Sequence, residues 1–150
     1  MTTTHILETA EAGIAYDACG PLPTADGLPP LFMIGQPMDA RGFATLASHF
    51  PDRTVVTYDP RGLGRSTRND GRADNTPTLQ AEDVHAVIEA LGAGPVQMFA
   101  SSGGAVTALA LVAAYPGDVT TLVAHEPPLL ANISTGPVPS ASITACTSAA

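Results

Sequence analysis

The architecture of this chain follows from the stretch Val96-Gln97-Met98-Phe99-Ala100-Ser101-Ser102-Gly103-Gly104-Ala105. An apolar strand runs directly into a serine with small neighbours, and an alanine-rich helix follows. A sharp strand-to-helix turn can present a serine hydroxyl when the residues two before and two after it are nearly free of side chain. With Ser102 as candidate nucleophile, the pattern is G-x-S-x-G with alanine as its first member. The same residues are also compatible with a plain helix start that Ser101 or Ser102 caps.

Three further segments bear on the choice between these interpretations. A β-branched strand, Thr54–Tyr58, ends in Asp59-Pro60-Arg61-Gly62-Leu63-Gly64-Arg65-Ser66. Upstream lies Leu31-Phe32-Met33-Ile34-Gly35-Gln36-Pro37, and downstream lies Thr120-Thr121-Leu122-Val123-Ala124-His125-Glu126-Pro127-Pro128. Each is an apolar run that ends in turn-forming or polar residues, as expected of buried strands in a parallel sheet.

In order and spacing, the four segments resemble the α/β-hydrolase family over roughly residues 6 to 130, the N-terminal portion of that fold. The turn after Tyr58 resembles the family's D-x-R-G-x-G-x-S turn, one strand before the nucleophile. The strand at Leu31 resembles the one that ends in His-Gly, with Ile34 where the family usually has histidine.

The resemblance implies a serine mechanism, in which Ser102 attacks an acyl carbonyl and forms a covalent ester. It implies an oxyanion hole made by the backbone N–H groups of Gly103 and Gln36. Pro37 cannot contribute, because proline has no N–H. The N-terminus of the following helix adds positive potential at the same place. The serine disfavours dehalogenases and epoxide hydrolases, whose nucleophile is an aspartate.

The base and the acid of the triad are less well defined. Triad order in this fold is Ser, then Asp/Glu, then His, and His125 is the one histidine after Ser102. It ends a strand where the family places an acid rather than a base. Glu126 is a candidate acid, and its alternative interpretation is a turn residue before Pro127. Asp59 is expected to shape its turn and to pair locally.

The predicted fold class is α/β, a partial α/β-hydrolase fold with a mostly parallel sheet and helices on both faces. A weak strand is expected near residues 13–16. The expected helices are one with Phe43, Leu46, Ala47 and Phe50 on its apolar face, one from Pro77 to Gly92, and one from about Ser102 to Ala114. The C-terminal strands and the cap of the family fold are expected to be missing.

Residues 1–130 are predicted to form the N-terminal part of the hydrolase domain. From Pro127 onward no residue is charged, and the periodicity is lost after Leu130. Residues 131–150 are therefore predicted to be a disordered tail, as after a frameshift or an early stop, and the chain to be truncated and nearly inactive. The strand that ends at His125 would then be an open sheet edge, which favours self-association.

Composition limits the partners. The formal net charge is −8 with six arginines and no lysine, which argues against nucleic acid and anionic membranes. The partner that the resemblance implies is a small acyl substrate. The arginines between Arg53 and Arg72 are expected in a solvated loop, and His85 is expected to be solvated. Without a signal peptide or an apolar run of 18 residues, the sequence predicts a cytoplasmic protein with free Cys19 and Cys146.

No cofactor or metal is predicted. Gly62-x-Gly64 lacks the third glycine and the helix of a dinucleotide site, and the four histidines have no ligand spacing. Esterase, peptidase, C–C bond hydrolase and perhydrolase activities all remain open. The alternatives from other classes are a non-catalytic remnant or interaction module that lacks the triad base and, third, a flavodoxin-like nucleotide-binding domain.

Overall fold

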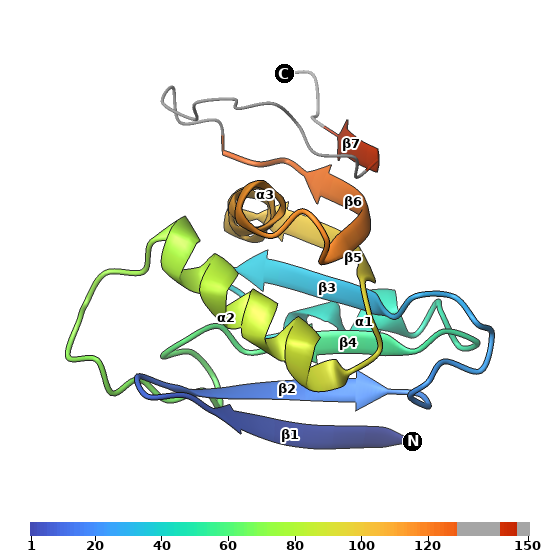
Figure 1. Cartoon of the computed structure of the whole chain (residues 1–150), viewed down its shortest axis with the longest axis horizontal. Coiled ribbons are helices and arrows are strands. Elements are labelled where there is room, and N and C mark those ends of the chain that lie inside the picture. Colours follow the sequence, from blue (N-terminus) through green and yellow to red (C-terminus); the bar gives the residue numbers. More distant parts are fainter. Residues whose placement is uncertain (129–141, 147–150) are drawn as a thin grey trace.

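A computed structural model describes the backbone of residues 1–128 and 142–146. Figure 1 shows a twisted sheet with its helices packed against it. Its strands are β1 (Thr2–Glu8), β2 (Gly13–Cys19), β3 (Leu31–Gln36), β4 (Val55–Tyr58), β5 (Val96–Ser102), β6 (Val119–His125) and β7 (Ser142–Cys146). The helices are the 3-10 helix η1 (Ala40–Phe43), α1 (Ala44–Ala47), α2 (Pro77–Leu91) and α3 (Gly103–Ala114).

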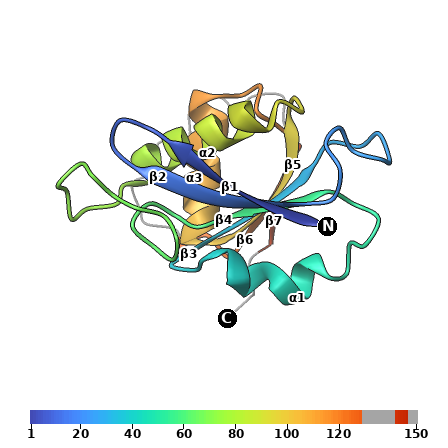
Figure 2. The same cartoon turned by 90° about the horizontal axis from the view of Figure 1, so that it is seen from below.

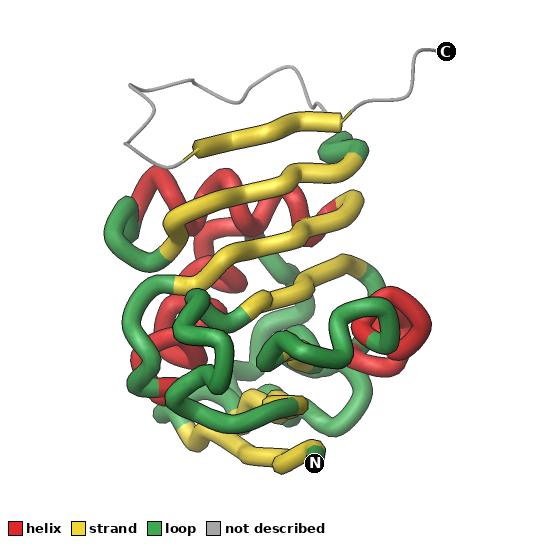
Figure 3. The backbone as a smooth tube through the Cα atoms, turned by 90° about the vertical axis from the view of Figure 1, so that its right-hand side faces the viewer, coloured by secondary structure: helices red, strands yellow, loops and turns green. Residues whose placement is uncertain are grey.

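The seven strands form one sheet in the order β1-β2-β4-β3-β5-β6-β7 (Figure 1). Figure 3 shows strands of this sheet stacked side by side, with the N-terminus at one end of the stack. The pairs β4–β3, β3–β5, β5–β6 and β6–β7 are parallel. The pairs β1–β2 and β2–β4 are antiparallel. The mostly parallel sheet that the alternation of strands and helices predicts is confirmed. Because parallel strands share a direction, the carboxyl ends of β3, β5 and β6 meet at one edge of the sheet.

Helices lie on both faces of the sheet, as predicted. Figure 2 places α2 and α3 on one face and α1 on the other. The larger core lies under α2 and α3 and includes Phe32, Met98 and Leu111, all at most 2% exposed. A smaller core around Met33 and Phe43 lies between β3 and the segment of η1 and α1. Burial on both faces explains why the parallel strands read as continuous apolar runs.

Helix α2 begins and ends where its sequence predicts. The hydroxyl of Thr76 caps it by accepting from the Leu79 N–H, and Pro77 occupies its first turn. Gly92 ends it in the left-handed conformation, with φ of 60°. Its stripe of Val84, Val87 and Ile88 is buried.

Three elements differ from the sequence expectations. Strand β1 was not expected, because nearly all of its side chains are exposed and it has no apolar alternation. The helix predicted through Phe50 ends at Ala47, and Phe50 is 36% exposed. Residues 142–146, predicted to belong to a disordered tail, form β7 and pair with β6. Strand β6 is therefore not the sheet edge, and the rest of the predicted tail lies outside the described residues.

Candidate active site

Ser102 occupies a strained backbone position between β5 and α3. Its φ is 55° and its ψ is −126°, a combination that only glycine adopts readily. The side chain is exposed, and its hydroxyl makes no capping hydrogen bond to α3. The turn therefore has the strain and the outward hydroxyl that the sequence interpretation requires, and a capping role for Ser102 is not supported.

Gly104 lets this turn approach the neighbouring strand. A Cβ atom at Gly104 would lie 2.7 Å from the Cα of Gly35 and 2.8 Å from the carbonyl oxygen of Ile34. Both are backbone atoms of β3, which cannot move aside cheaply. The need for a small residue two positions after the serine thus comes from packing against β3.

The same approach brings Gly103 and Gln36 together. A Cβ at Gly103 would lie 3.1 Å from the Cβ of Gln36, and Gln36 is the register partner of Ser102 in the β3–β5 pair. Gly103 is the first residue of α3, so its N–H has no acceptor within the helix. The structure therefore places Ser102, Gly103 and Gln36 side by side at the carboxyl edge of the sheet.

The end of β6 contributes two titratable residues to this edge. His125 pairs with Ser101 in the β5–β6 register, and the Ser101 hydroxyl lies 3.2 Å from its Nδ1 atom. The side-chain hydrogen bond of His125 is thus with Ser101 and not with Ser102. Glu126 is exposed and has a positive φ of 47°, so a second non-glycine residue in the left-handed region stands one strand away from Ser102.

Asp59 follows β4 and is 2% exposed. Its carboxylate accepts hydrogen bonds from the N–H of Ala40 and from the N–H and Nε of Arg65, all at 2.8–2.9 Å. Burial by itself would raise the pKa of Asp59, but the bonds from Arg65 and Ala40 outweigh it and hold that pKa below its ordinary value. Asp59 thus pairs locally, as expected, and stays ionised.

The arginine-rich segment is not the solvated loop that the sequence suggested. The side chain of Arg61 is 4% exposed and binds both oxygens of Asp83 at 2.7 and 3.0 Å. It also reaches Asp70 at 3.1 Å and Glu11 at 3.2 Å. A buried charge is tolerated because it is paired on every side, and this pairing ties the segment to α2 and to the β1–β2 turn.

His85 is likewise not simply solvated. Its Nδ1 lies 2.7 Å from Asp118, and its ring stacks on Tyr115 with centroids 3.7 Å apart. Helical periodicity could not reveal these contacts, because Tyr115 and Asp118 lie beyond the end of α3. The pair ties α2 to the turn before β6 and lies at the opposite end of the sheet from Ser102.

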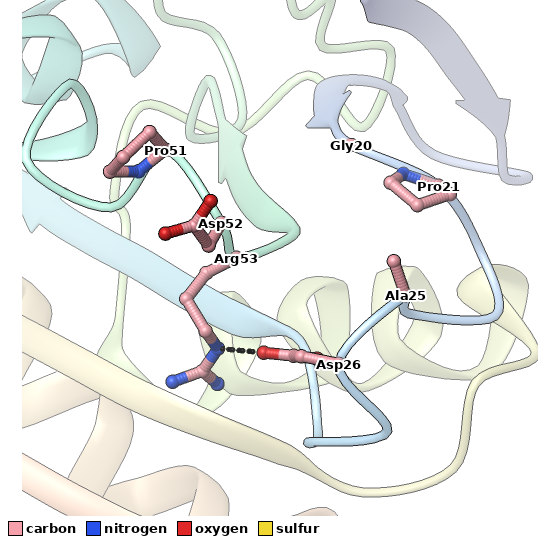
Figure 4. A pocket seen from close by; sticks show the side chains of 7 residues that line it. All are labelled: Gly20, Pro21, Ala25, Asp26, Pro51, Asp52 and Arg53. Atoms are coloured by element: carbon pink, nitrogen blue, oxygen red, sulfur yellow. Dashed lines mark ion pairs between the residues drawn. The ribbon is translucent and has the colours of Figure 1, made fainter.

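Two surface pockets lie away from Ser102. One, of about 400 Å³, is lined by Gly20, Pro21, Ala25, Asp26, Pro51, Asp52 and Arg53, with Arg53 paired to Asp26 at 3.1 Å (Figure 4). The other, of about 700 Å³, lies beside α1 and includes Phe43, Phe50 and Val55.

Within residues 1–128 and 142–146, no three His, Cys, Asp or Glu side chains gather as a metal site. None of the helices in this part of the chain is long and apolar enough to cross a bilayer.

The α/β-hydrolase class of proteins is defined by a mostly parallel sheet in which one strand leads, through a strained turn at a serine, into a buried helix. The comparison with known families agrees, because the pattern of the alpha/beta hydrolase fold family matches residues 31–142. The chain belongs to this family and corresponds to the N-terminal portion of its fold.

Individual relatives support the assignment. An uncharacterized hydrolase, YraK, of Bacillus subtilis (strain 168) is 33% identical over 125 residues, which are 83% of this chain and 44% of that protein. A proline iminopeptidase of Xylella fastidiosa (strain 9a5c) is 32% identical over 109 residues, 72% of this chain and 34% of its own. The crystal structure of an alpha/beta hydrolase from Sphaerobacter thermophilus has a TM-score of 0.68 at 29% identity, covering 83% of this chain and 45% of that one. This chain therefore spans less than half the length of these relatives.

Proposed function

We propose that this chain carries the nucleophile and oxyanion hole of a serine hydrolase that acts on a small ester or other acyl substrate. The observation that carries the proposal is the backbone of Ser102, with φ of 55° and ψ of −126°. Strain of this kind costs about 1–3 kcal/mol and persists where the surrounding structure holds it, typically at functional sites.

The proposed mechanism starts with attack by the Ser102 oxygen on the acyl carbonyl, while the hydroxyl proton passes to a base. The bond to the leaving group then breaks, the leaving group takes up that proton, and an acyl-serine ester remains. Water then hydrolyses this ester, which releases the acid and restores the Ser102 hydroxyl. The N–H groups of Gly103 and Gln36 would stabilise the negative charge that develops on the carbonyl oxygen. Losing one such donor typically costs about 3 kcal/mol in the transition state.

The site has no assigned base for Ser102. A serine hydroxyl needs a base to become a good nucleophile, and the one histidine after Ser102 in these 150 residues is His125, which bonds to Ser101 instead. Glu126, at the end of the neighbouring strand, is the candidate acid. We therefore expect the 150-residue chain to turn over slowly, since removing a triad serine or histidine costs subtilisin about a factor of a million.

Several classes of leaving group are compatible with this mechanism. Relatives of this chain carry the names hydrolase and proline iminopeptidase, so esters, amides and peptides are all candidates. The contact of His125 with Ser101 favours one alternative: a non-catalytic remnant or interaction module that keeps the fold of the site without its base.

A fluorophosphonate probe distinguishes the two functions. The hydrolase proposal expects slow covalent labelling of the 150-residue chain, mapped to Ser102 by peptide mass spectrometry and lost in S102A. The matched control is S101A, which removes the neighbouring hydroxyl and should label at the wild-type position. Absence of labelling, or labelling at Ser101, would favour the remnant.

Turnover is measured separately with a p-nitrophenyl ester. We expect hydrolysis far slower than that of a complete esterase, with the residual rate lost in S102A. A rate equal to that of a complete esterase would contradict the expectation that this chain lacks an effective base.

A further inference from the structure

The carboxylate of Asp59 joins two loops that are distant in sequence. One oxygen, Oδ1, accepts from the N–H of Ala40 at 2.9 Å, and Ala40 begins η1 just after β3. The other oxygen, Oδ2, accepts from the N–H and the Nε of Arg65, each at 2.8 Å. Asp59 thus fixes the segment that follows β3 to the turn that follows β4.

The segment that Asp59 holds comes directly after the proposed oxyanion donor. Gln36 is the last residue of β3 and is held by the pairing of β3 with β5, where its partner is Ser102. Ala40, four residues later, is held by Asp59. Only residues 37–39 lie between these two anchors. Met38 and Phe43 also hold this segment through the smaller core, so loss of Asp59 would remove its polar anchor at Ala40 and leave apolar contacts there.

The surrounding residues fit tightly around this anchor. Gly64 has a positive φ of 57°, and a Cβ there would lie 2.6 Å from Oδ2 of Asp59 and 3.3 Å from the Cβ of Asp39. The turn after β4 therefore packs directly against both the carboxylate and the segment that it anchors. Arg65 in turn binds Asp17 of β2 through two bonds of 2.9 Å, which extends the connection into the sheet.

We propose that Asp59 is a positioning residue for the oxyanion hole, which it acts on by holding Ala40 and hence the segment from Gln36 onward. The inference rests on the function proposed above for Ser102, Gly103 and Gln36. Asp59 itself touches no substrate in this scheme. Its charge matters because a carboxylate can accept from Ala40 and Arg65 at once, whereas an amide would turn an N–H toward one of these two donors.

Asp70 supplies a matched control. Its side chain is 4% exposed, compared with 3% for Asp59, and it also binds arginines, at 2.6 Å from Arg68 and 3.1 Å from Arg61. Its carboxylate also accepts from the N–H of Arg72, so its hydrogen bonds stay within the arginine-rich segment and do not reach residues 36–40. D70N therefore removes a similarly buried, arginine-bound charge without touching the proposed anchor.

The test uses the 150-residue chain as wild type, D59N and D70N, with two measurements. The rate of fluorophosphonate labelling at Ser102, corrected for the folded fraction, should fall about 10- to 100-fold in D59N, because a displaced donor can cost this much. It should stay within about threefold in D70N, the scatter we allow for a variant that leaves the site in place. Amide hydrogen exchange at residues 38–40 should accelerate in D59N relative to the core strands, but not in D70N.

The outcomes separate the two proposals. Labelling of D59N at the wild-type rate, or an equal loss in D70N, would overturn the positioning role and leave the nucleophile assignment intact. Wild-type protein that is not labelled at Ser102 would overturn the proposed function, and the positioning role would fall with it. Faster exchange throughout D59N, without selectivity for residues 38–40, would indicate a general structural role and also overturn the inference.

Discussion

At the scale of single residues, the serine turn combines a conformation that favours glycine with a residue that is not glycine. Glu126 repeats this combination at the end of the next strand, with φ of 47°. The side chains of Ser102 and Glu126 are both exposed. Burial of these side chains therefore does not account for the strain, and strain of this kind is typical of functional sites.

This strain gives the first prediction. Ser102→Gly should raise the free energy of unfolding by about 1 kcal/mol, because glycine relieves a strain of about 1–3 kcal/mol and loses part of that gain to its greater freedom in the unfolded chain. Ser102→Ala keeps the strain and should change the stability by less than about 0.5 kcal/mol. Urea unfolding measures both. A glycine variant no more stable than the alanine variant would contradict the strained conformation at Ser102.

The close approach of α3 to β3 gives a second prediction. Gly104→Ala should destabilise the protein by about 1–3 kcal/mol, because the added methyl group meets the backbone of Gly35 and Ile34 within 2.8 Å. Gly117→Ala is the matched control, since a Cβ there has nothing within 4 Å and should be nearly neutral. Equal urea midpoints for the two variants would contradict the packing described here.

At the scale of elements, α2 is the helix whose local signals are clearest. Thr76→Ala should lower the free energy of unfolding by about 1 kcal/mol, because the Leu79 N–H loses its acceptor. Thr78→Ala changes the same residue type two positions further on, inside the helix and exposed, and should be neutral or slightly stabilising. Thermal unfolding of the pair measures the difference, and equal losses would show that Thr76 is not the cap.

The elements also differ in how well sequence predicts them. Strands β3 to β6 and helices α2 and α3 were predictable because they are buried runs bounded by Pro77, Gly92 and the Tyr115-Pro116-Gly117 stop. Strand β1 was not, because it is held by backbone pairing with β2 rather than by an apolar face. The partners of Arg61 were hidden for a related reason: Glu11, Asp70 and Asp83 become neighbours only in the folded chain.

The candidate site also has parts that the sequence predicts and parts that it does not. Gln36 ends β3, Ser102 ends β5 and Gly103 begins α3, and these strand ends meet at one edge of the sheet, so topology alone places the three residues together. The contact between Asp59 and Ala40 depends on how two loops fold back on each other. Sequence periodicity does not predict contacts between loops. The sequence therefore predicted that Asp59 shapes its turn, but it did not predict the hydrogen bond to Ala40 in the segment after β3.

At the scale of the whole molecule, the buried ion pairs set the response to acid. Hydrogen bonds from Arg68 lower the pKa of Asp70 despite its burial. Burial by itself would raise the pKa values of Asp17 and Asp59, but hydrogen bonds that include those from Arg65 outweigh it, so both pKa values are lowered. These carboxylates bind protons more tightly in the unfolded chain, where the pKa of Asp is about 3.9. Their contribution to stability is therefore complete above about pH 4 and is lost as the pH falls below it.

Urea midpoints between pH 2 and 7 measure this dependence. The wild-type midpoint should fall steeply below about pH 4, and D70N should show a shallower fall because one of the linked carboxylates is gone. Between pH 7 and the isoelectric point near 4.6, loss of the net charge of −8 reduces repulsion in the compact state and acts in the opposite direction, whereas below that point the chain becomes positively charged. A midpoint that does not fall between pH 4 and pH 2 would contradict the contribution of these ion pairs.

Strand β1 lies at an edge of the described sheet, and Ile6 on it is 59% exposed. Unpaired backbone groups beside an exposed apolar side chain favour edge-to-edge pairing, which a lysine on the edge opposes. We therefore expect light scattering to show a mass that rises with protein concentration, and Ile6→Lys to shift this rise to higher concentration. Leu28→Lys carries the same change in charge at a 47% exposed side chain outside the strands, and it should leave the association unchanged. A monomer at all concentrations, or an equal effect of the two lysines, would mean that association does not proceed through β1.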